Sequence, residues 1–314
     1  MQLPVDLQLA LEQEVQACSM QELQRAARQM SEQYRSGKDS KALFLSPAAC
    51  LAYLMVRMPA TYAAIRSVLD ECFLRSNWQP RSMVDIGAGP GTGGWAAMES
   101  FPLLESICFV EPSRSMSEIG QRLSRQADQG PMQRAVWKER APYPAADLAL
   151  LSYCVAEMTA SQRNVILETL WKQETPVIAI IEPGTPAGFQ RILQIREQAL
   201  GWGAQIIAPC THALGCPMEK KGWCHFPARV ERTRLHKLLK TGTLGYEDEK
   251  FSYLVIGKNP IKRSLGRVVG SSKKNSGFVK IPLCSEGQLK EIVVSRKQDE
   301  YRLARKIEYG DAWM

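Results

Sequence analysis

Apolar runs long enough to cross a membrane are missing from this sequence of 314 residues, because none approaches the ~20 residues that a spanning helix requires. No Lys or Arg precedes Arg25, so we expect neither a secretory signal nor an Arg-rich transit peptide. Without an export signal, the nine cysteines argue against a disulfide framework and for reduced thiols or metal ligands. We therefore expect a soluble, cytoplasmic protein of bacterial type that has no membrane partner.

Charge is distributed unevenly along the chain. Residues 1–200 carry 19 Lys and Arg against 21 Asp and Glu, whereas residues 201–314 carry 21 against 11, so the excess positive charge lies in the last third. Such a segment favours a polyanionic partner, most simply a nucleic acid, over a merely solvated basic surface. The hydrophobic content of 45% and charged content of 23% are those of an ordinary globular protein, with length for one large or two modest domains.

A glycine-rich loop organises the first half of the chain. The apolar run from Met83 to Ile86 ends at three alternating glycines, and a helix-forming segment follows from Trp95. This order of strand, tight turn and helix opens α/β nucleotide-binding folds, where glycines let a ligand approach the backbone and free helix amides face it. The candidate ligand-binding residues are Asp85, Gly87, Ala88, Gly89, Pro90, Gly91 and Thr92.

The spacing of this loop bears on the identity of the ligand. The dinucleotide fingerprint would need a glycine in place of Thr92, so NAD fits imperfectly. The pattern Asp85-x-Gly87-x-Gly89-x-Gly91-Thr92 instead resembles motif I of class I S-adenosylmethionine (SAM) methyltransferases, which implies that the loop passes under the methionine part of SAM. Glu111 ends the second predicted strand, where an acidic residue binds ribose hydroxyls; the alternative is an ordinary solvent-facing glutamate.

From residue 82 onward, apolar runs alternate with helical patterns, which predicts a mostly parallel sheet covered on both faces. Residues 5–77 have the spacing of helices. We expect an α/β, Rossmann-like fold of the class I methyltransferase type, with a seven-stranded sheet. The predicted strands of that sheet are 84–86, 107–110, 135–137, 147–153, 177–181, 205–208 and 251–256.

The expected division of the chain has three parts. A helical region spans 1–79, and a methyltransferase-like domain spans 80–258 with a cysteine-rich insertion, 209–250, between its last two strands. A small, basic, β-rich module spans 259–314 and supplies the last cysteine. The start of this module is less regular: residues 258–277 are rich in Lys, Arg, Ser and Gly and are typical of a linker or of exposed basic loops.

Nine cysteines fall into two groups by their surroundings. Cys210, Cys216, Cys224 and Cys284 lie in loops or at a strand end, in positions that can wrap an ion or a cluster. The gaps between the first three are wider than the knuckles of structural zinc sites, whereas an iron–sulfur cubane tolerates dispersed ligands. His212 and His225 keep a Cys3His zinc site open, and absence of metal is the third alternative. The other cysteines are expected to be buried as small hydrophobic residues: Cys18, Cys50, Cys72, Cys108 and Cys154.

Several motifs accompany the cysteines from about residue 50 to the C-terminus. They are Arg57-x-Pro59-Ala60-Thr61-Tyr62, the glycine loop with Trp95-Ala96-Ala97, Glu182-Pro183-Gly184-Thr185-Pro186, Trp223-Cys224-His225-Phe226, Tyr246 to Leu254, and Tyr309-Gly310-Asp311-x-Trp313. Together they resemble the methyltransferase-like assembly proteins of the mitochondrial ribosomal small subunit and their bacterial relatives. The resemblance implies a [4Fe–4S] cluster on Cys210, Cys216, Cys224 and Cys284. It also implies binding to small-subunit ribosomal RNA (rRNA) during assembly, and no DNA partner is expected.

Catalytic residues are not identified by the sequence. Methyl transfer from SAM needs alignment and sometimes a base, rather than a covalent nucleophile. The segment after the fourth predicted strand lacks the Asn/Asp-Pro-Pro-aromatic motif of base-methylating enzymes. Ser152 is a candidate for the cofactor pocket, and Tyr153 and Glu157 are candidates to line it; a satisfied polar strand end is the alternative.

Three functions therefore stay open. The first is a SAM-dependent rRNA methyltransferase whose cluster organises an RNA-binding lobe. The second is a non-catalytic ribosome-assembly factor in which SAM stabilises the fold, with a structural zinc in place of the cluster. The third is a redox-responsive factor in which loss of the cluster disorders residues 209–250 and releases the RNA.

Overall fold

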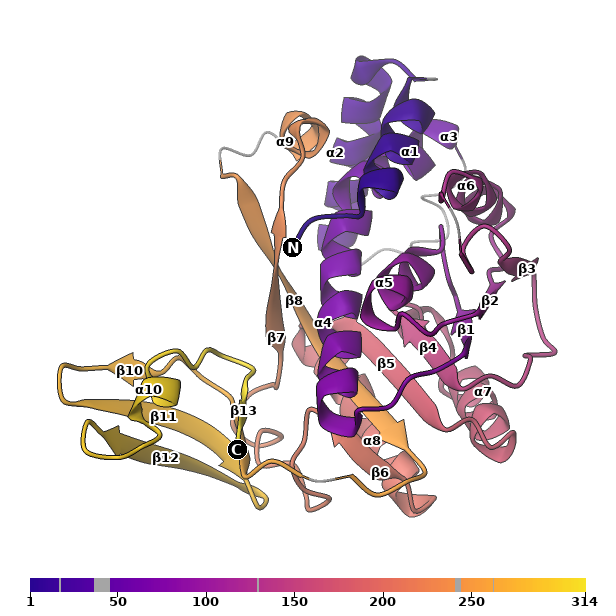
Figure 1. The fold of residues 1–314 in the computed structure, drawn as a ribbon. Helices are drawn as coiled ribbons and strands as arrows, with labels where there is room; N and C mark the ends of the chain where they lie inside the picture. Colours follow the sequence, from indigo (N-terminus) through magenta and orange to yellow (C-terminus); the bar gives the residue numbers. More distant parts are fainter. Residues whose placement is uncertain (17, 37–45, 129, 241–243, 262) are drawn as a thin grey trace.

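Figure 1 shows the fold in a computed structural model, which describes residues 1–16, 18–36, 46–128, 130–240, 244–261 and 263–314. Four helices precede the central sheet: α1 (Val5–Val15), α2 (Met20–Ser36), α3 (Pro47–Val56) and α4 (Met58–Ser76). The expected helical region is therefore present, although residues 37–45 fall outside the described part of the chain. Helix α3 begins where Pro47 occupies the first turn and the Ser46 side chain accepts a hydrogen bond from the Ala49 amide.

Helix α4 runs along the body of the protein and packs against the sheet (Figure 1). Most of its length is buried, and a left-handed Asn77 ends it. Among the described residues, no single helix has the length and apolar composition of a membrane span, and α3 and α4 meet that criterion only as a pair bent by 47°.

The central sheet confirms the predicted fold class. Its strand order is β3-β2-β1-β4-β5-β8-β6; the first five strands are parallel, and β8 is antiparallel to both of its neighbours. A parallel sheet that ends in an antiparallel hairpin is the arrangement of class I methyltransferases. The strands are β1 (Ser82–Ile86), β2 (Ser106–Val110), β3 (Val136–Lys138), β4 (Leu148–Ser152), β5 (Val177–Pro183), β6 (Gln205–Ala208) and β8 (Tyr246–Gly257).

Helices cover both faces of this sheet. On one face α4 and α5 (Thr92–Ser100) pack over Met83, Ala179 and Ile181, with α6 (Arg114–Arg125) beyond them. Alternate residues of the same strands, such as Val84 and Ile180, point into a second core that α7 (Ala160–Lys172) and α8 (Pro186–Gly201) cover. The loops after β1, β2 and β4 therefore gather at one edge of the sheet, where ligands of such folds bind.

The cysteine-rich insertion contains two elements that were not predicted. Strand β7 (Phe226–Glu231) pairs with the first half of β8, and α9 (Arg234–Lys240) follows it. Because β8 has twelve residues, its first half extends beyond the central sheet to pair with β7 while its second half lies between β5 and β6.

The C-terminal module forms a separate, five-stranded sheet with its own small core around Val279, Ile281 and Trp313. It projects from the body as a yellow lobe in Figure 1. Residues 266–268, predicted to lie in an exposed basic linker, instead form a buried strand of this sheet, so that interpretation was wrong there. The elements are β9 (Gly266–Val268), β10 (Lys273–Lys274), β11 (Phe278–Ser285), β12 (Gln288–Ser295), α10 (Tyr301–Ala304) and β13 (Ala312–Trp313).

Candidate functional site

The glycine loop turns directly after β1, and its three alternating glycines all have positive φ: +69° at Gly87, +55° at Gly89 and +82° at Gly91. A Cβ on Gly87 would lie 2.5 Å from the Cβ of Cys154, so this position needs glycine for space as well as for conformation. A Cβ on Gly89 would meet no atom within 4 Å, which leaves open space above that part of the loop.

Glu111 follows β2 and holds the loop in place. Its carboxylate accepts hydrogen bonds of 2.7 Å from the Gly89 amide and 2.7 Å from the Ser113 amide. Burial raises the pKa of Glu111, although both amide hydrogen bonds favour the ionised form. The ribose-binding role of Glu111 stays a prediction, and the structure adds a second role, which is to fix the backbone of Gly89.

Beneath the loop lie buried polar atoms with no hydrogen-bond partner in the described structure: both carboxylate oxygens of Asp85 and the hydroxyl of Thr92. Asp85 is fully buried, and burial raises its pKa to about 8. A Cβ on Gly93 would lie 2.3 Å from an Asp85 oxygen, so the bare helix start is what accommodates this carboxyl group. The amino acid part of SAM carries an ammonium group, and an unpaired carboxyl group in this position fits it.

The segment after β4 has an unusual conformation. Tyr153 has φ +57°, and its hydroxyl donates a 3.2 Å hydrogen bond to Glu249 of β8. Glu249 also receives two hydrogen bonds from Arg57, of 3.0 and 3.3 Å. Burial and the Glu249 charge raise the pKa of Tyr153 well above its ordinary value, so Tyr153 is not a ready base. Ser152 is half-buried beside it and Glu157 is exposed in the following turn of 3-10 helix.

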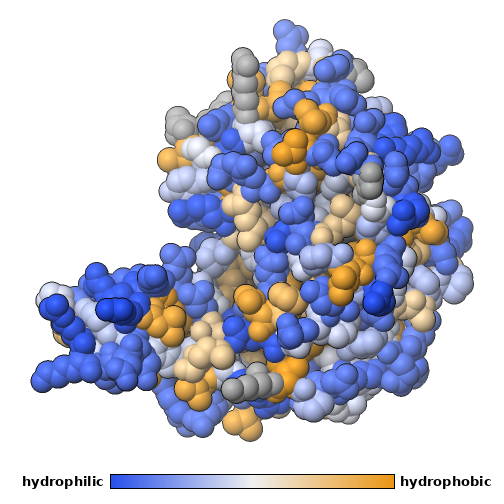
Figure 2. Space-filling model, viewed as in Figure 1, coloured by the Kyte–Doolittle hydropathy of each residue, from blue (hydrophilic) through white to orange (hydrophobic). Residues whose placement is uncertain are grey.

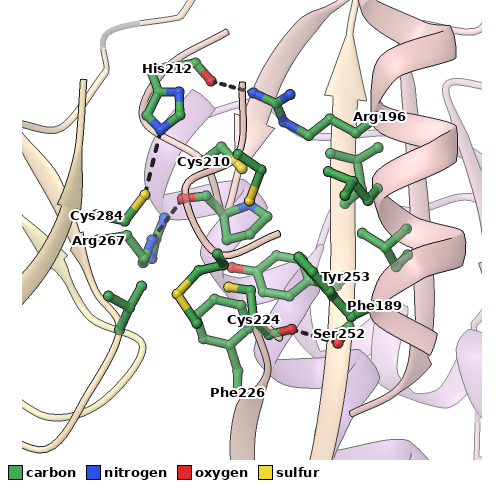
Figure 3. A pocket seen from close by; sticks show the side chains of 17 residues that line it. Phe189, Arg196, Cys210, His212, Cys224, Phe226, Ser252, Tyr253, Arg267 and Cys284 are labelled. Carbon is green, nitrogen blue, oxygen red and sulfur yellow. Dashed lines mark hydrogen bonds between the residues drawn. The ribbon is translucent and has the colours of Figure 1, made fainter. Parts of the chain in front are cut away.

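The four predicted metal-binding cysteines line one cavity (Figure 3). Cys210 comes directly after β6 and a cis-proline, Cys216 lies in the following loop, and Cys224 lies just before β7. Cys284 comes from β11 in the C-terminal sheet. The cavity is therefore lined by residues of both the insertion and the C-terminal module. The other five cysteines do not line it, and Cys18 is half-buried rather than buried.

Burial and the neighbouring thiols raise the pKa of three of these cysteines. The pKa of Cys284 rises to about 12, that of Cys224 lies well above its ordinary value, and that of Cys216 is also raised. Thiols in such a place are protonated at neutral pH unless a positively charged group binds them as thiolates. The donor set therefore fits a metal centre.

Two buried arginines line the same cavity and were not predicted. Arg196 of α8 is 2% exposed, donates to the carbonyls of His212 and Leu214, and interacts with the Cys210 sulfur. Arg267 of β9 is 3% exposed and has a 2.7 Å ion pair with Glu71 of α4. Two buried cations beside four thiols suit a group of net negative charge, which a thiolate-bound cluster would be.

Zinc and cluster differ in the size of site that they need. Among the described residues, no three His, Cys, Asp or Glu side chains converge closely enough to hold a single ion. His212 does line the cavity, with Nε2 3.5 Å from the Cys284 sulfur, whereas His225 lies outside it.

Residues 47–314 match the sequence profile of the family described as mitochondrial small ribosomal subunit Rsm22. Human mitochondrial ribosome assembly protein METTL17 is 23% identical over an alignment of 286 residues that covers 83% of this chain and 61% of that protein. The mitochondrial Rsm22-cox11 tandem protein 2 of Schizosaccharomyces pombe is 24% identical over an alignment of 333 residues, gaps included, that covers 87% of this chain and 44% of that protein. The chain thus spans less than two thirds of the length of either relative.

Solved structures of methyltransferases also resemble this chain. Magnesium protoporphyrin IX methyltransferase from Synechocystis with bound SAM has a TM-score of 0.41 at 11% identity, over 63% of this chain and 79% of that one. An O-methyltransferase family protein from Burkholderia thailandensis has a TM-score of 0.45 at 14% identity, over 76% and 70% of the two chains.

Proposed function

The chain belongs to the mitochondrial small ribosomal subunit Rsm22 family, and from this membership we propose that it assists assembly of the small ribosomal subunit by binding rRNA. We further propose that Cys210, Cys216, Cys224 and Cys284 hold a [4Fe–4S] cluster. The observation that carries the proposal is that these four thiols, which come from the insertion and from the C-terminal sheet, line one cavity together with two buried arginines.

The cluster would act as a structural link when bound, because its ligands come from both the insertion and the C-terminal module. The protein side of this link is already partly formed. Arg267 donates from Nε to the Pro209 carbonyl at 2.8 Å and from Nη1 to the Gly310 carbonyl at 2.9 Å. It thereby ties the loop that carries Cys210 to the C-terminal segment, and with Arg196 it offsets the negative charge of bound thiolates.

The surface of the C-terminal module supports the rRNA partner. Figure 2 shows that the projecting lobe is largely hydrophilic in this view. Exposed lysines and arginines lie on it at Lys273, Lys274, Arg296, Lys297, Arg302, Arg305 and Lys306. A surface of this kind binds phosphates through charge, so affinity for RNA should fall steeply as salt is added.

Binding of SAM at the glycine loop is a separate part of the proposal, with Asp85 and Glu111 as the acidic residues and Ser152 at the pocket edge. Methyl transfer to rRNA is the second candidate function, favoured by the unpaired groups beneath the loop. The alternative is a non-catalytic factor. It is favoured by the Tyr153 hydroxyl, which is engaged in a hydrogen bond to Glu249. The location of the chain stays a prediction: the sequence predicts a cytoplasmic protein, whereas the relatives named above are mitochondrial.

The proposal is tested on protein purified without oxygen. We expect about four irons per chain, a brown colour, and binding to immature small subunits that weakens with salt. One zinc per chain without iron would contradict the cluster and support the alternative of a structural zinc site. Calorimetry with SAM, followed by an assay of labelled methyl transfer to immature subunits, separates the two functions. SAM binding without methyl transfer would exclude the methyltransferase function.

A further inference from the structure

Outside the cysteine cavity, three aromatic rings form a column that ends at the protein surface. The ring of Trp223 stacks on His225, with centroids 5.5 Å apart and planes at 26°. His225 in turn lies 5.7 Å from Tyr309, at 35°. Tyr309 contacts Phe226, a buried residue of β7, at 6.0 Å. The column thus rises from the core to Trp223, whose 37% exposure is the highest of these rings.

The outer ring is held firmly. The Trp223 indole N–H donates a 3.0 Å hydrogen bond to the carbonyl of Gly184, at the end of β5. The Gly184 amide in turn donates to the Lys250 carbonyl of β8 at 2.8 Å. Gly310 has φ +96°, and a Cβ there would lie 2.9 Å from the Phe226 ring, so the C-terminal segment approaches the column closely. A ring fixed in this way loses little conformational entropy when something stacks on it.

Exposed lysines lie next to Trp223 in the sequence and beside His225 in the structure. Lys220 and Lys221 are exposed in the turn that leads to Trp223, and exposed Lys250 interacts electrostatically with His225. Glu219 is the exposed acid in the same turn. A fixed aromatic face beside several lysines is the combination that binds single-stranded nucleic acid, where bases stack on rings and cations contact phosphates.

We propose that Trp223 is a stacking platform for an unpaired base of RNA, with Lys220, Lys221 and Lys250 contacting the adjacent phosphates. The inference rests on the proposed rRNA partner and adds to it a specific surface and a preference for single strands over duplex. Because Trp223 and His225 flank Cys224, the platform is built on the same short segment that reaches the cysteine cavity.

The test uses the full, metal-loaded chain and a fluorescein-labelled single-stranded oligoadenylate, measured by anisotropy at low salt. Trp223→Ala is expected to lose about tenfold or more in affinity, because stacking of one base on an aromatic ring contributes roughly that much. Trp223→Phe keeps a flat ring and should stay within about threefold of wild type. Tyr246→Ala is the matched control, since Tyr246 is also an exposed aromatic of this region but Arg229 covers its ring at 4.1 Å.

A further variant controls for loss of structure around Cys224, which is adjacent to Trp223. Trp223→Leu keeps apolar bulk without a flat ring and should lose affinity as Trp223→Ala does, at unchanged metal content and circular dichroism. Equal affinity of wild type, Trp223→Ala and Trp223→Leu would overturn the platform while leaving RNA binding intact. If wild type bound no oligoadenylate and no immature subunits, the proposed function would fail together with the platform. Tighter binding of duplex than of single strand would also overturn it.

Discussion

The glycine loop takes its residues from one short stretch, Asp85 to Thr92, with Glu111 added by the next strand, whereas the cysteine cavity draws on segments as distant as α8, the insertion and β11. Glu111 accepts hydrogen bonds from the Gly89 amide of the loop and from the Ser113 amide that follows β2. The cavity instead is lined by four thiols and two buried arginines, which pair with Glu197 and Glu71.

Because of this contrast, we expect the stability of the two sites to depend differently on a bound ligand. The loop is held by the hydrogen bond from the Gly89 amide to Glu111, and among its described residues only a few buried atoms, chiefly those of the Asp85 carboxyl group, have no hydrogen-bond partner. The cavity gathers charged and protonatable groups that a bound metal centre would neutralise, so the fold around it should depend on that centre. Changes at the cavity are therefore expected to affect stability more than changes at the loop.

The largest effect is expected from Cys284→Ser. Because Cys284 is the one proposed ligand from the second sheet, its loss should empty the cavity of metal and lower the free energy of unfolding by about 4–5 kcal/mol or more. Iron analysis and urea unfolding measure the two effects. Cys108→Ala, a buried cysteine of β2 away from the cavity, is the control and should keep its metal. Full iron content in Cys284→Ser would show that the C-terminal module supplies no ligand.

Arg267→Met tests the buried cation. Its removal takes the 2.7 Å partner from Glu71, which keeps Arg75 at 3.1 Å, and breaks the two hydrogen bonds to backbone carbonyls, so we expect a loss of about 3 kcal/mol in urea unfolding. Arg263→Met changes an exposed arginine of the same segment and should stay within about 0.5 kcal/mol of wild type. Similar stabilities for the two variants would mean that the ion pair with Glu71 contributes little.

Asp85→Asn tests the loop through pH. Burial raises the pKa of Asp85 to about 8, against about 3.9 in an unfolded chain. The folded protein thus keeps a proton that the unfolded chain has lost, so this stabilisation is present below about pH 4 and is lost as pH rises toward 8. Relative to wild type, Asp85→Asn should gain about 1 kcal/mol per pH unit across that range and bind SAM more weakly. Parallel stability curves would contradict the buried, protonated carboxyl group.

The smallest effect is expected from Gly89→Ala. Its left-handed backbone should cost about 1–2 kcal/mol, since no atom lies within 4 Å of the added methyl group. Gly87→Ala is the matched variant and should cost more in thermal unfolding, because its methyl group would also overlap Cys154. Calorimetry should show that Gly89→Ala weakens SAM binding through the space it fills. Unchanged SAM affinity would place the ligand elsewhere.

The sequence predicted the sheet well because its strands are continuous apolar runs, such as Val177 to Ile181, which need burial on both faces. It also singled out the four cysteines that line one cavity, although from distinctive residues rather than from any rule about distance, and their role as metal ligands stays a prediction. It missed β7, where Phe226, Ala228 and Val230 alternate with exposed residues; that period of two was a usable signal, interrupted by Pro227.

Other features could not be predicted, because they depend on partners far away in the chain. Arg267 sits in a basic segment, and only Glu71 of α4 and two backbone carbonyls make its burial possible. The same holds for Glu249, whose bonds to Arg57 and Tyr153 join β8 to the starts of two distant segments. Charge and hydropathy along the sequence carry no record of such pairs.

The position of Cys284 on β11 has a consequence for synthesis of the protein. During synthesis Cys210, Cys216 and Cys224 are made before β8, and Cys284 is made only after β8 is complete. A chain that stops before β11 therefore contains every strand of the central sheet and still lacks the fourth thiol. Loading of the metal centre would therefore distinguish finished chains from incomplete ones.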